Sequence, residues 1–340
     1  MSFVLLNKIE TKPVEFLEPA QFASSSDQIL NDALRAAEAH RIIRSNLQQI
    51  LKPGCSLLSI AETVEKCTRI LLKGEKNNGI GFPCGMSLND CAAHFTLNPG
   101  DQDIFLKESD VLKIDFGVHS NGRIMDSAFT VCYDPKYLEL LKASQEATKR
   151  GLEVIGIDSM VCEIGREIHE VFKSFEIELD NKLTKIKPVW NLNGHSIEQY
   201  KIHGGISIPP INNGDTSRVK AGFCAIETFA STGKGEITDR GESSHFMLSS
   251  NAPNSKIYNQ KNEQVLNLIK KEMGTLPFSP RHVEYYMKDA FPSIKLLALR
   301  KFIDPYPPLY DIPKSLVAQF EHTVYLTESG KTILTKGDDY

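Results

Sequence analysis

The 340-residue sequence predicts an α+β fold in which one sheet takes its strands from distant parts of the chain. From Ser26 to Leu51 apolar side chains recur at helical spacing, whereas from Gly79 to Tyr133 β-branched and apolar residues are interrupted by Gly, Pro and Asn. A chain of this length with 41% hydrophobic residues can bury a large core, either as one domain with an insertion or as two ordinary domains.

The helix over residues 26–51 is expected to end at Pro53-Gly54, since neither residue continues a helix well. Ser59 and Glu62 form a capping-box pattern, so we expect a second helix that begins at Ser59 and ends at Lys73-Gly74. The further elements that the spacing predicts are a helix over residues 135–172 and strands over 202–208, 222–229 and 318–326.

Residues 251–302 differ from the rest of the chain in charge. They carry nine Lys or Arg against four Asp or Glu, whereas the whole chain has a formal net charge of -4. Helical spacing at 265–273, 283–291 and 295–302 predicts three inserted helices. The basic excess indicates contact with an RNA-rich surface such as a ribosome, although a solvated helical face explains the same charges equally well.

The bulk composition favours a soluble protein of the cytoplasm. A pI near 6.2 gives no overall field that would attract nucleic acid or an acidic membrane, and no window approaches transmembrane length. Lys8 and Glu10 interrupt the N-terminal apolar run too early for a signal-peptide core. Seven scattered cysteines without a CxxC pair indicate reduced thiols. We expect a monomer without a membrane or a specific nucleic acid as partner.

The stretch IDFGVHSNGRIMD, residues 114–126, predicts a β-hairpin with a type I′ turn at Asn121-Gly122. That turn places Asp115 opposite Ala128, and Ala128 shares its face with Asp126 two residues away. The two carboxylates then form a diagonal pair roughly 7 to 8 Å apart at the backbone. In an apolar setting they require a cation or a proton. A solvent-facing pair of aspartates is the alternative, because a one-residue change in the turn would separate them.

Three further metal-ligand candidates stand in apolar surroundings: His195, Glu227 and Glu321. Taken singly, the histidine could be an ordinary core or loop residue, and the glutamates could pair with Lys or Arg. Together with Asp115 and Asp126 they form four carboxylates and one imidazole without cysteine. That donor set suits a di-metal hydrolytic site for Mn, Fe, Co or Zn.

These five positions, in this order, resemble the metal ligands of the pita-bread metallopeptidases. The likeness runs from about Leu30 to Tyr340 and is most specific for the type 2 methionine aminopeptidases. The matching words are GFPCGMSLNDCAAHFTLNPGD (with Gly81 and Phe95 where that class has Ala and Tyr), KIDFGVHSNGRIMDSAFT, NLNGHSIEQYKIHGG, AIETFASTGKG and AQFEHT. The resemblance implies a curved, mostly antiparallel sheet flanked by helices, in one catalytic domain of residues 1–340 with a helical, winged-helix-like insertion at 248–305.

The resemblance implies removal of the initiator methionine from nascent polypeptides whose second residue is small. Asp126 and Glu321 would bridge two divalent metals, Asp115 would chelate one of them, and His195 with Glu227 would hold the other. A hydroxide shared by the two metals would attack the first peptide bond. Glu227 would carry the proton as general base and acid.

Two more histidines and an apolar pocket complete the implied site. His203 would hydrogen-bond the substrate carbonyl or oxyanion, and His94 would contact the scissile amide. The resemblance also implies that His94 is alkylated by epoxides of the fumagillin type. The residues implied to bind the methionine side chain are Phe82, Ile202, Phe229, His245 and Tyr306.

Other readings of the same residues stay open at this point. Another pita-bread peptidase, a prolidase or an aminopeptidase P, would share the metals and differ in the side-chain pocket. A non-catalytic relative would use the fold to bind RNA or protein, and a structural adaptor would have no reason to place five metal ligands in apolar strands. The sequence does not select among the four candidate metals.

Overall fold

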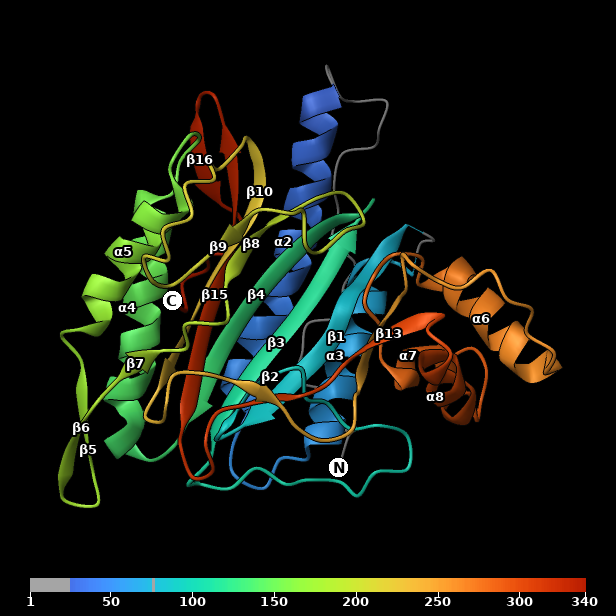
Figure 1. Cartoon of the computed structure of the whole chain (residues 1–340), viewed down its shortest axis with the longest axis horizontal. Coiled ribbons are helices and arrows are strands. Elements are labelled where there is room, and N and C mark those ends of the chain that lie inside the picture. The colour runs from blue at the N-terminus through green and yellow to red at the C-terminus, as the bar shows by residue number, and fades with distance from the viewer. Residues whose placement is uncertain (1–24, 75–76) are drawn as a thin grey trace.

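The computed structural model describes residues 25–74 and 77–340, and it has the α+β organisation that the sequence predicts (Figure 1). The expectation about the N-terminal apolar run lies outside the described residues. A three-stranded antiparallel sheet has the order β1 (Asn78–Leu88), β3 (Val111–Ser120), β4 (Arg123–Cys132). A second, six-stranded sheet has the order β16 (Gly330–Ile333), β15 (Val317–Thr327), β10 (Gly222–Ser231), β8 (Gly194–Ile197), β9 (Ser207–Ile208), with β7 (Lys187–Pro188) also pairing with β10.

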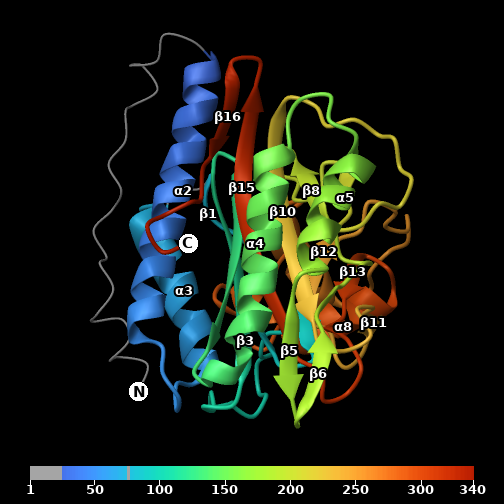
Figure 2. The same ribbon diagram turned by 90° about the vertical axis from the view of Figure 1, so that its left-hand side faces the viewer.

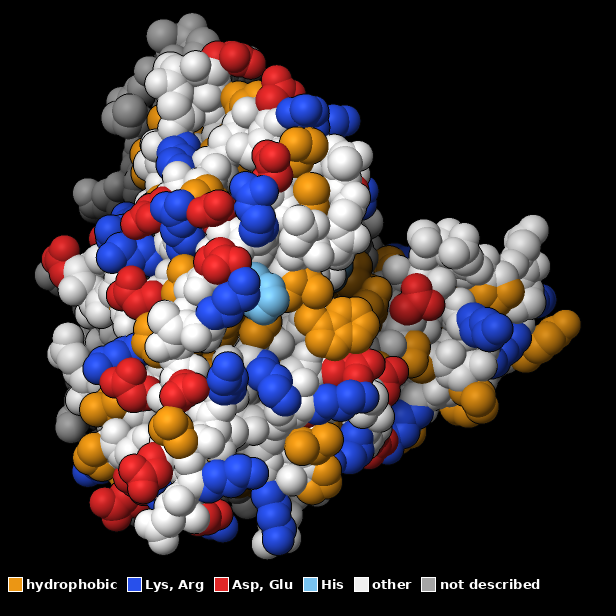
Figure 3. All heavy atoms as spheres, turned by 60° about the vertical axis from the view of Figure 1, so that its left-hand side comes forward, with side chains coloured by type: hydrophobic (Ala, Val, Ile, Leu, Met, Phe, Trp, Pro, Cys, Tyr) orange, Lys and Arg blue, Asp and Glu red, His pale blue; other side chains and the backbone are white. Residues whose placement is uncertain are grey.

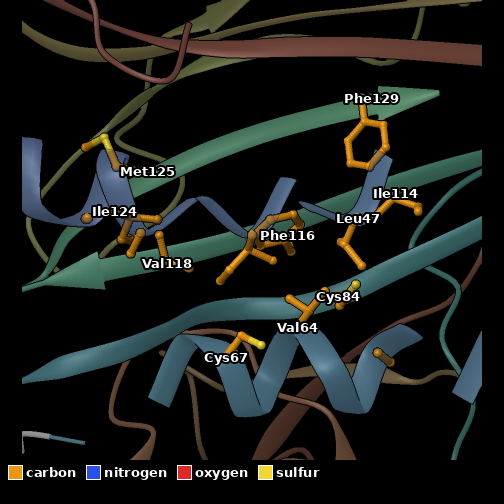
Figure 4. Packing of buried hydrophobic residues seen from close by; sticks show 14 of the residues in the cluster. Leu47, Val64, Cys67, Cys84, Ile114, Phe116, Val118, Ile124, Met125 and Phe129 are labelled. Carbon is orange, nitrogen blue, oxygen red and sulfur yellow. The ribbon is translucent and has the colours of Figure 1, made fainter. Parts of the chain in front are cut away.

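Two pairs of helices cover the two sheets (Figure 2). The helices α2 (Ser25–Ile50) and α3 (Leu57–Leu71) pack on the first sheet, and α4 (Leu138–Val154) and α5 (Val161–Phe172) lie over the second. Figure 4 shows the packing on the first sheet, where Leu47 of α2 and Val64 of α3 meet side chains of β1, β3 and β4. Burying such apolar side chains fixes each helix pair on its sheet.

Side-chain hydroxyls join the two sheets where β4 runs beside β15. Gln319 N donates to Thr130 Oγ1 at 2.8 Å, and this hydroxyl donates back to Gln319 O at 2.7 Å. Asp126 N and Thr323 Oγ1 make the same exchange at 2.8 and 2.7 Å. Ser127 Oγ donates to Glu321 O at 2.7 Å. These bonds satisfy buried backbone groups although β4 and β15 do not pair as strands. They also bring Asp126 of the first sheet close to Glu321 of the second.

The predicted hairpin is confirmed residue by residue. Ser120 pairs with Arg123, and Asp115 pairs with Ala128, as the two-residue turn requires. Asn121 and Gly122 both have positive φ, 48° and 76°, which is the signature of a type I′ turn.

Outside the basic segment, three local expectations are wrong. Helix α3 is capped by Ser56, whose hydroxyl accepts from Ser59 N at 2.9 Å, so Ser59 lies inside the helix and not at its cap. The helix expected over residues 135–172 is broken between α4 and α5, where Asp158 has a φ of 66°. Only Ser207–Ile208 of the strand expected at 202–208 pairs as a strand.

The basic segment folds into helices beside the two sheets, at the right of Figure 1. It contains α6 (Gln260–Glu272), α7 (Pro280–Glu284) and α8 (Phe291–Leu299), between β12 (His245–Leu248) and β13 (Ile303–Tyr306), with a hydrophobic cluster of its own. The helix expected at 283–291 is wrong, because α7 ends at Glu284. The helix expected at 295–302 begins four residues earlier, since Pro292 occupies its first turn. The insertion bounds of 248–305 remain a prediction.

The remaining elements are short. They are β2 (Cys91–Ala93), β11 (Thr238–Asp239) and β14 (Leu309–Tyr310), which form one small sheet, the hairpin β5 (Glu176–Leu179) and β6 (Lys182–Lys185), and the 3-10 turn η2 (Pro135–Tyr137). All seven cysteines are free thiols, as expected. In the part of the chain that is described, we find no helix long and apolar enough to cross a bilayer. Acidic and basic side chains are interspersed on the face shown in Figure 3.

Candidate functional site

The predicted site residues lie around one cavity of about 100 Å³. All twelve of them line it: Phe82, His94, Asp115, Asp126, His195, Ile202, His203, Glu227, Phe229, His245, Tyr306 and Glu321. They come from both sheets, from the β12–β13 ribbon and from the loops that follow β2 and β8. Residues up to 239 positions apart in the chain therefore surround a single space.

Strand register turns the five predicted ligands toward the same cavity. Glu227 on β10 is paired with Glu321 on β15, so both side chains lie on the same face. His195 on β8 is paired with Ala225, which shares that face with Glu227 two residues later. The hairpin of the first sheet supplies the two aspartates from the other side.

The donor atoms of three of the predicted ligands lie close together. Asp126, His195 and Glu321 each offer one donor atom within 4.8 Å of the others, and all three are buried. His195 Nε2 lies 3.5 Å from Asp126 Oδ2. Asp115 and Glu227 are linked by an amide, because Gln319 Nε2 donates to Asp115 Oδ2 at 3.1 Å and to Glu227 Oε2 at 3.0 Å.

The carboxylates are crowded and lack a positive partner. None of the ion pairs among the described residues gives these four acids a Lys or Arg, so the alternative of lysine- or arginine-paired glutamates is not supported. Asp126 is only 4% exposed, which contradicts the solvent-facing alternative. Asp115 Oδ1 and Glu321 Oε2 are buried without a hydrogen-bond partner. Buried, uncompensated oxygen donors of this kind fit a divalent cation.

Burial and mutual repulsion change how these acids titrate. Burial, followed by the nearby Asp126, raises the pKa of Asp115 well above its usual value. The same two causes raise the pKa of Glu321, and burial with Asp115 raises the pKa of Glu227. Without a cation, these acids would retain their protons to a higher pH than isolated carboxyl groups do.

His94 lines the same cavity as the acids and has a strained backbone conformation. Its φ is 61°, in the left-handed region that non-glycine residues seldom adopt. Its ring centroid lies 5.6 Å from that of His245 and 6.2 Å from that of Tyr306. Burial lowers the pKa of His94 to about 4, and Nδ1 has no hydrogen-bond partner. The imidazole is therefore neutral at pH 7, and its ring lies on the cavity lining.

His203 lies beside a predicted metal ligand. Its ring meets that of His195 edge to face, with centroids 4.6 Å apart. Burial, followed by the neighbouring His195, lowers the pKa of His203 to about 4. A neutral His203 can donate a hydrogen bond to an oxygen at the ligand cluster.

An apolar wall closes one end of the cavity. His245 and Tyr306 are paired across β12 and β13, and the buried Ile202 and Phe229 lie on the cavity lining. Phe82 packs flat over Gly117, where a Cβ atom would lie only 2.1 Å from the ring. Gly117 thus makes room for one wall of the pocket.

Several residues at the site were not predicted from the sequence, among them Gln319, which is hydrogen-bonded to Asp115 and Glu227. Gln319 stands two residues before Glu321 on β15, so strand alternation places it on the same face, and this signal could have identified it. The unpredicted residues that line the cavity include Ala93, Leu192, Met247 and Pro277. These apolar residues carry no pattern that distinguishes a pocket from a core.

A family model described as metallopeptidase family M24 matches residues 32–328. The chain is 52% identical to "Methionine aminopeptidase 2" of Encephalitozoon hellem, with all of both chains covered. It is 44% identical to the protein of the same name from Schizosaccharomyces pombe, covering 91% of this chain and 73% of that protein.

Solved structures show the same fold at low sequence identity. A thermophilic Arx1 superposes with a TM-score of 0.77 and 16% identity, covering 92% of each chain. A methionine aminopeptidase from Thermotoga maritima superposes with a TM-score of 0.61 and 17% identity, covering 95% of this chain and all of that one. A prolidase from Pyrococcus furiosus gives a TM-score of 0.53 at 16% identity, over 92% of this chain and 64% of that one.

Proposed function

This chain belongs to metallopeptidase family M24 and adopts its pita-bread fold, and on that premise we propose that it is a methionine aminopeptidase of the type 2 class. It removes the initiator methionine from polypeptides with a small second residue. The observation that carries this proposal is the gathering of five hard ligands, two neutral histidines and an apolar wall around one cavity. Relatives named methionine aminopeptidase 2 match along the whole chain, which favours this activity over that of a prolidase.

We propose that the site binds two divalent cations. Asp126 and Glu321 would be shared between them, Asp115 would hold one, and His195 with Glu227 would hold the other. The crowded acids, with two buried oxygens that lack any partner, fit this arrangement. When bound, such cations lower the pKa of a shared water and so supply a nucleophile near neutral pH. Mn, Fe, Co and Zn are all compatible with the donor set.

The chain's own residues handle the protons and the peptide bond. Glu227 is placed to accept a proton at a carboxylate oxygen and later return it to the leaving amine. His203 donates a hydrogen bond to the carbonyl oxygen as negative charge develops there. His94 contacts the scissile amide from the opposite wall, and its neutral ring can accept or donate a proton there.

The apolar wall selects the side chain. Phe82, Ile202, Phe229, His245 and Tyr306 would surround the methionine thioether, a soft group that suits aromatic and aliphatic neighbours. Limited space beside the acids would restrict the second residue to small side chains.

We also propose the cytoplasm as the place of action, because newly made N-termini and reduced cysteines both occur there. The basic balance of the insertion favours contact with a ribosome.

A peptide panel tests the proposed specificity. Peptides that begin Met-Gly, Met-Ala, Met-Thr or Met-Val should be cleaved, whereas those with Lys, Phe or Leu in second place should not. Efficient release of residues other than Met from Xaa-Pro peptides would contradict the proposal and favour an aminopeptidase P activity.

A further inference from the structure

We propose that Arg281, held by Glu65 and His282, is a positioning residue that fixes the catalytic segment around His94. The inference rests on the proposed role of His94 and extends it, since it gives the helical insertion a part in the reaction. The cluster joins α7 of the insertion to α3 of the catalytic domain, which are more than 200 residues apart in the chain.

The three charged or polar side chains form a buried cluster. Arg281 Nη2 lies 2.8 Å from Glu65 Oε1, and His282 Nε2 lies 3.1 Å from the same oxygen. The side chains of Glu65 and Arg281 are only 8% and 9% exposed. Burial alone would raise the pKa of Glu65, but Arg281 and His282 hold it well below its usual range. The acid is therefore ionised and fixes the guanidinium in one place.

The same guanidinium reaches the segment that follows His94. Arg281 Nη2 donates to Thr96 Oγ1 at 3.1 Å, and Nη1 donates to the backbone oxygen of Leu97. Thr96 and Leu97 follow His94 in the chain and are separated from it only by Phe95. An arginine of the insertion thus contacts the segment after β2, which also carries the proposed catalytic side chain of His94.

That segment needs support, because His94 is strained. A non-glycine residue with φ near 61° persists only when its surroundings hold it there. Three other hydrogen bonds share the task. Thr96 N donates to Ser244 Oγ at 3.0 Å, Ser244 Oγ donates to His94 O at 3.3 Å, and Met86 N donates to Phe95 O at 2.6 Å.

The insertion is itself anchored to the pocket wall. Phe246 N donates to Phe278 O at 2.9 Å, and Phe278 N donates to Phe246 O at 2.8 Å. Phe246 follows His245 on β12, and Phe278 lies two residues before α7. The position of Arg281 is therefore tied to the wall that faces His94, so that the insertion, the wall and the catalytic segment form one unit.

Metal binding should not depend on this unit. The five proposed ligands lie on β3, β4, β8, β10 and β15, whereas the side-chain hydrogen bonds of Arg281 among the described residues go to Glu65 on α3 and to Thr96 and Leu97 after β2. Loss of the Arg281 contacts should therefore lower turnover without lowering metal affinity. If Arg281 served only general folding, its loss would lower turnover and metal affinity together, or would leave both unchanged.

The test uses the full chain with Arg281→Met and Glu65→Gln combined. This pair leaves no buried charge without a partner, and the amide introduced at position 65 retains an oxygen that accepts from His282 Nε2. The expected result is a kcat lower by about 10²-fold, the cost typical of a displacement near 1 Å, with a KM changed much less. Calorimetry should give unchanged Mn affinity, and a crystal structure should show His94 outside the left-handed region.

Two further variants keep the test decisive. Arg281→Lys retains the charge beside Glu65 but loses the fork that reaches Thr96 and Leu97 together, so we expect an intermediate loss of roughly tenfold. It carries the test if the double variant does not fold. The matched control is Lys295→Met with Glu242→Gln, which removes an exposed ion pair that also joins the insertion to the catalytic domain. The control should keep wild-type turnover.

Two results would overturn the inference in different ways. If His94→Ala kept full turnover, the proposed role of His94 would fail, and this inference with it. If His94→Ala were impaired but the folded Arg281 variants kept wild-type kcat and the same His94 backbone, only the positioning role would fail.

Discussion

Two buried acidic clusters in this molecule have opposite electrostatic character. At Glu65, burial alone would raise the pKa, but the partners Arg281 and His282 hold it well below the usual range. At the cavity, burial and neighbouring acids raise the pKa values of Asp115, Glu227 and Glu321. The first cluster contains its own cations, and the second contains none.

The difference separates a structural use of buried acids from a binding use. A complete ion pair holds two elements together and needs no ligand. A group of acids that lacks positive charge is unfavourable by itself and becomes favourable only when cations enter. The fold can maintain such a group because the strand registers and the hydroxyl bonds between β4 and β15 leave the side chains no alternative position.

The largest expected effect follows from breaking the cavity cluster. Asp126→Asn should lower turnover by at least about 10³-fold, because water without a bound cation keeps a pKa near 16 in place of about 7. Steady-state assays with Met-Ala peptides check this. Chelation of the wild-type protein should give the same loss, and added Mn or Co should restore the wild type but not the variant. Full activity of Asp126→Asn would contradict the assignment.

His94 should be essential without being a ligand. His94→Ala is expected to lower kcat by about 10² to 10⁴ while metal content and folding are kept, as for a lost acid-base or hydrogen-bonding group. His119 is the matched control, because burial also lowers its pKa to about 4 but it lies away from the cavity. Equal losses at the two positions would mean that His94 acts through folding.

The neutral His94 on the cavity lining, together with the resemblance to type 2 enzymes, also predicts a covalent reaction. Treatment with fumagillin should give one adduct per chain, located on His94 by intact-mass measurement and peptide mapping. An adduct on another residue would remove this support for an accessible, unprotonated imidazole.

Breaking the paired cluster should affect stability more than the removal of a cavity acid. Glu65→Ala leaves Arg281 buried without its partner and should lower the free energy of unfolding by about 3 to 5 kcal/mol. Urea unfolding of the chelated protein measures this. A change below about 1 kcal/mol would show that the pair contributes little.

At the cavity, removal of an acid should stabilise the metal-free protein, in contrast to the destabilisation expected at Glu65. In the chelated protein at pH 8, Asp115→Asn should raise the free energy of unfolding, since burial and the nearby Asp126 both disfavour the ionised form of Asp115. Destabilisation by this substitution in the absence of metal would contradict the repulsion that we infer.

The two clusters should also respond to pH in opposite directions. The raised pKa values at the cavity favour the folded, metal-free protein below the ordinary values of 3.8 for Asp and 4.5 for Glu, and that stability is lost as the pH rises. Glu65, with a lowered pKa, contributes above pH 4.5 and loses its contribution as the pH falls. Unfolding of the wild type and of Glu65→Gln across pH 2 to 8 separates the two contributions.

The sequence predicts the local geometry of the site better than the helix ends and long-range contacts that hold the site in place. The Asn121-Gly122 turn determined the register that puts Asp115 and Asp126 on one face, because hairpin registers follow from the turn alone. The predicted cap of α3, Ser59, lies three residues after the actual cap, Ser56. Both residues are serines that could cap a helix, and only the structure shows that the Ser56 hydroxyl accepts from Ser59 N. Helix α7 was expected too long for a similar reason, as helical spacing does not show where a helix ends.

Long-range polar pairs were not visible in the sequence. Nothing local to Glu65 indicates that Arg281 lies beside it, because the pairing depends on how the insertion packs on α3. Gln319 was missed although its alternation with Glu321 was available, since a glutamine in an apolar strand does not by itself indicate a metal site. The resemblance to a known family supplied the pocket residues, which apolar character alone could not have identified.

Anomalous scattering from crystals soaked in Mn or Co tests the central claim most directly, namely that the unpaired acids of the cavity form a binding site for two cations. The account predicts two peaks roughly 3.5 to 4 Å apart, between the aspartates of β3 and β4 and the ligands His195, Glu227 and Glu321. A single peak, two distant peaks, or none at these residues would contradict it.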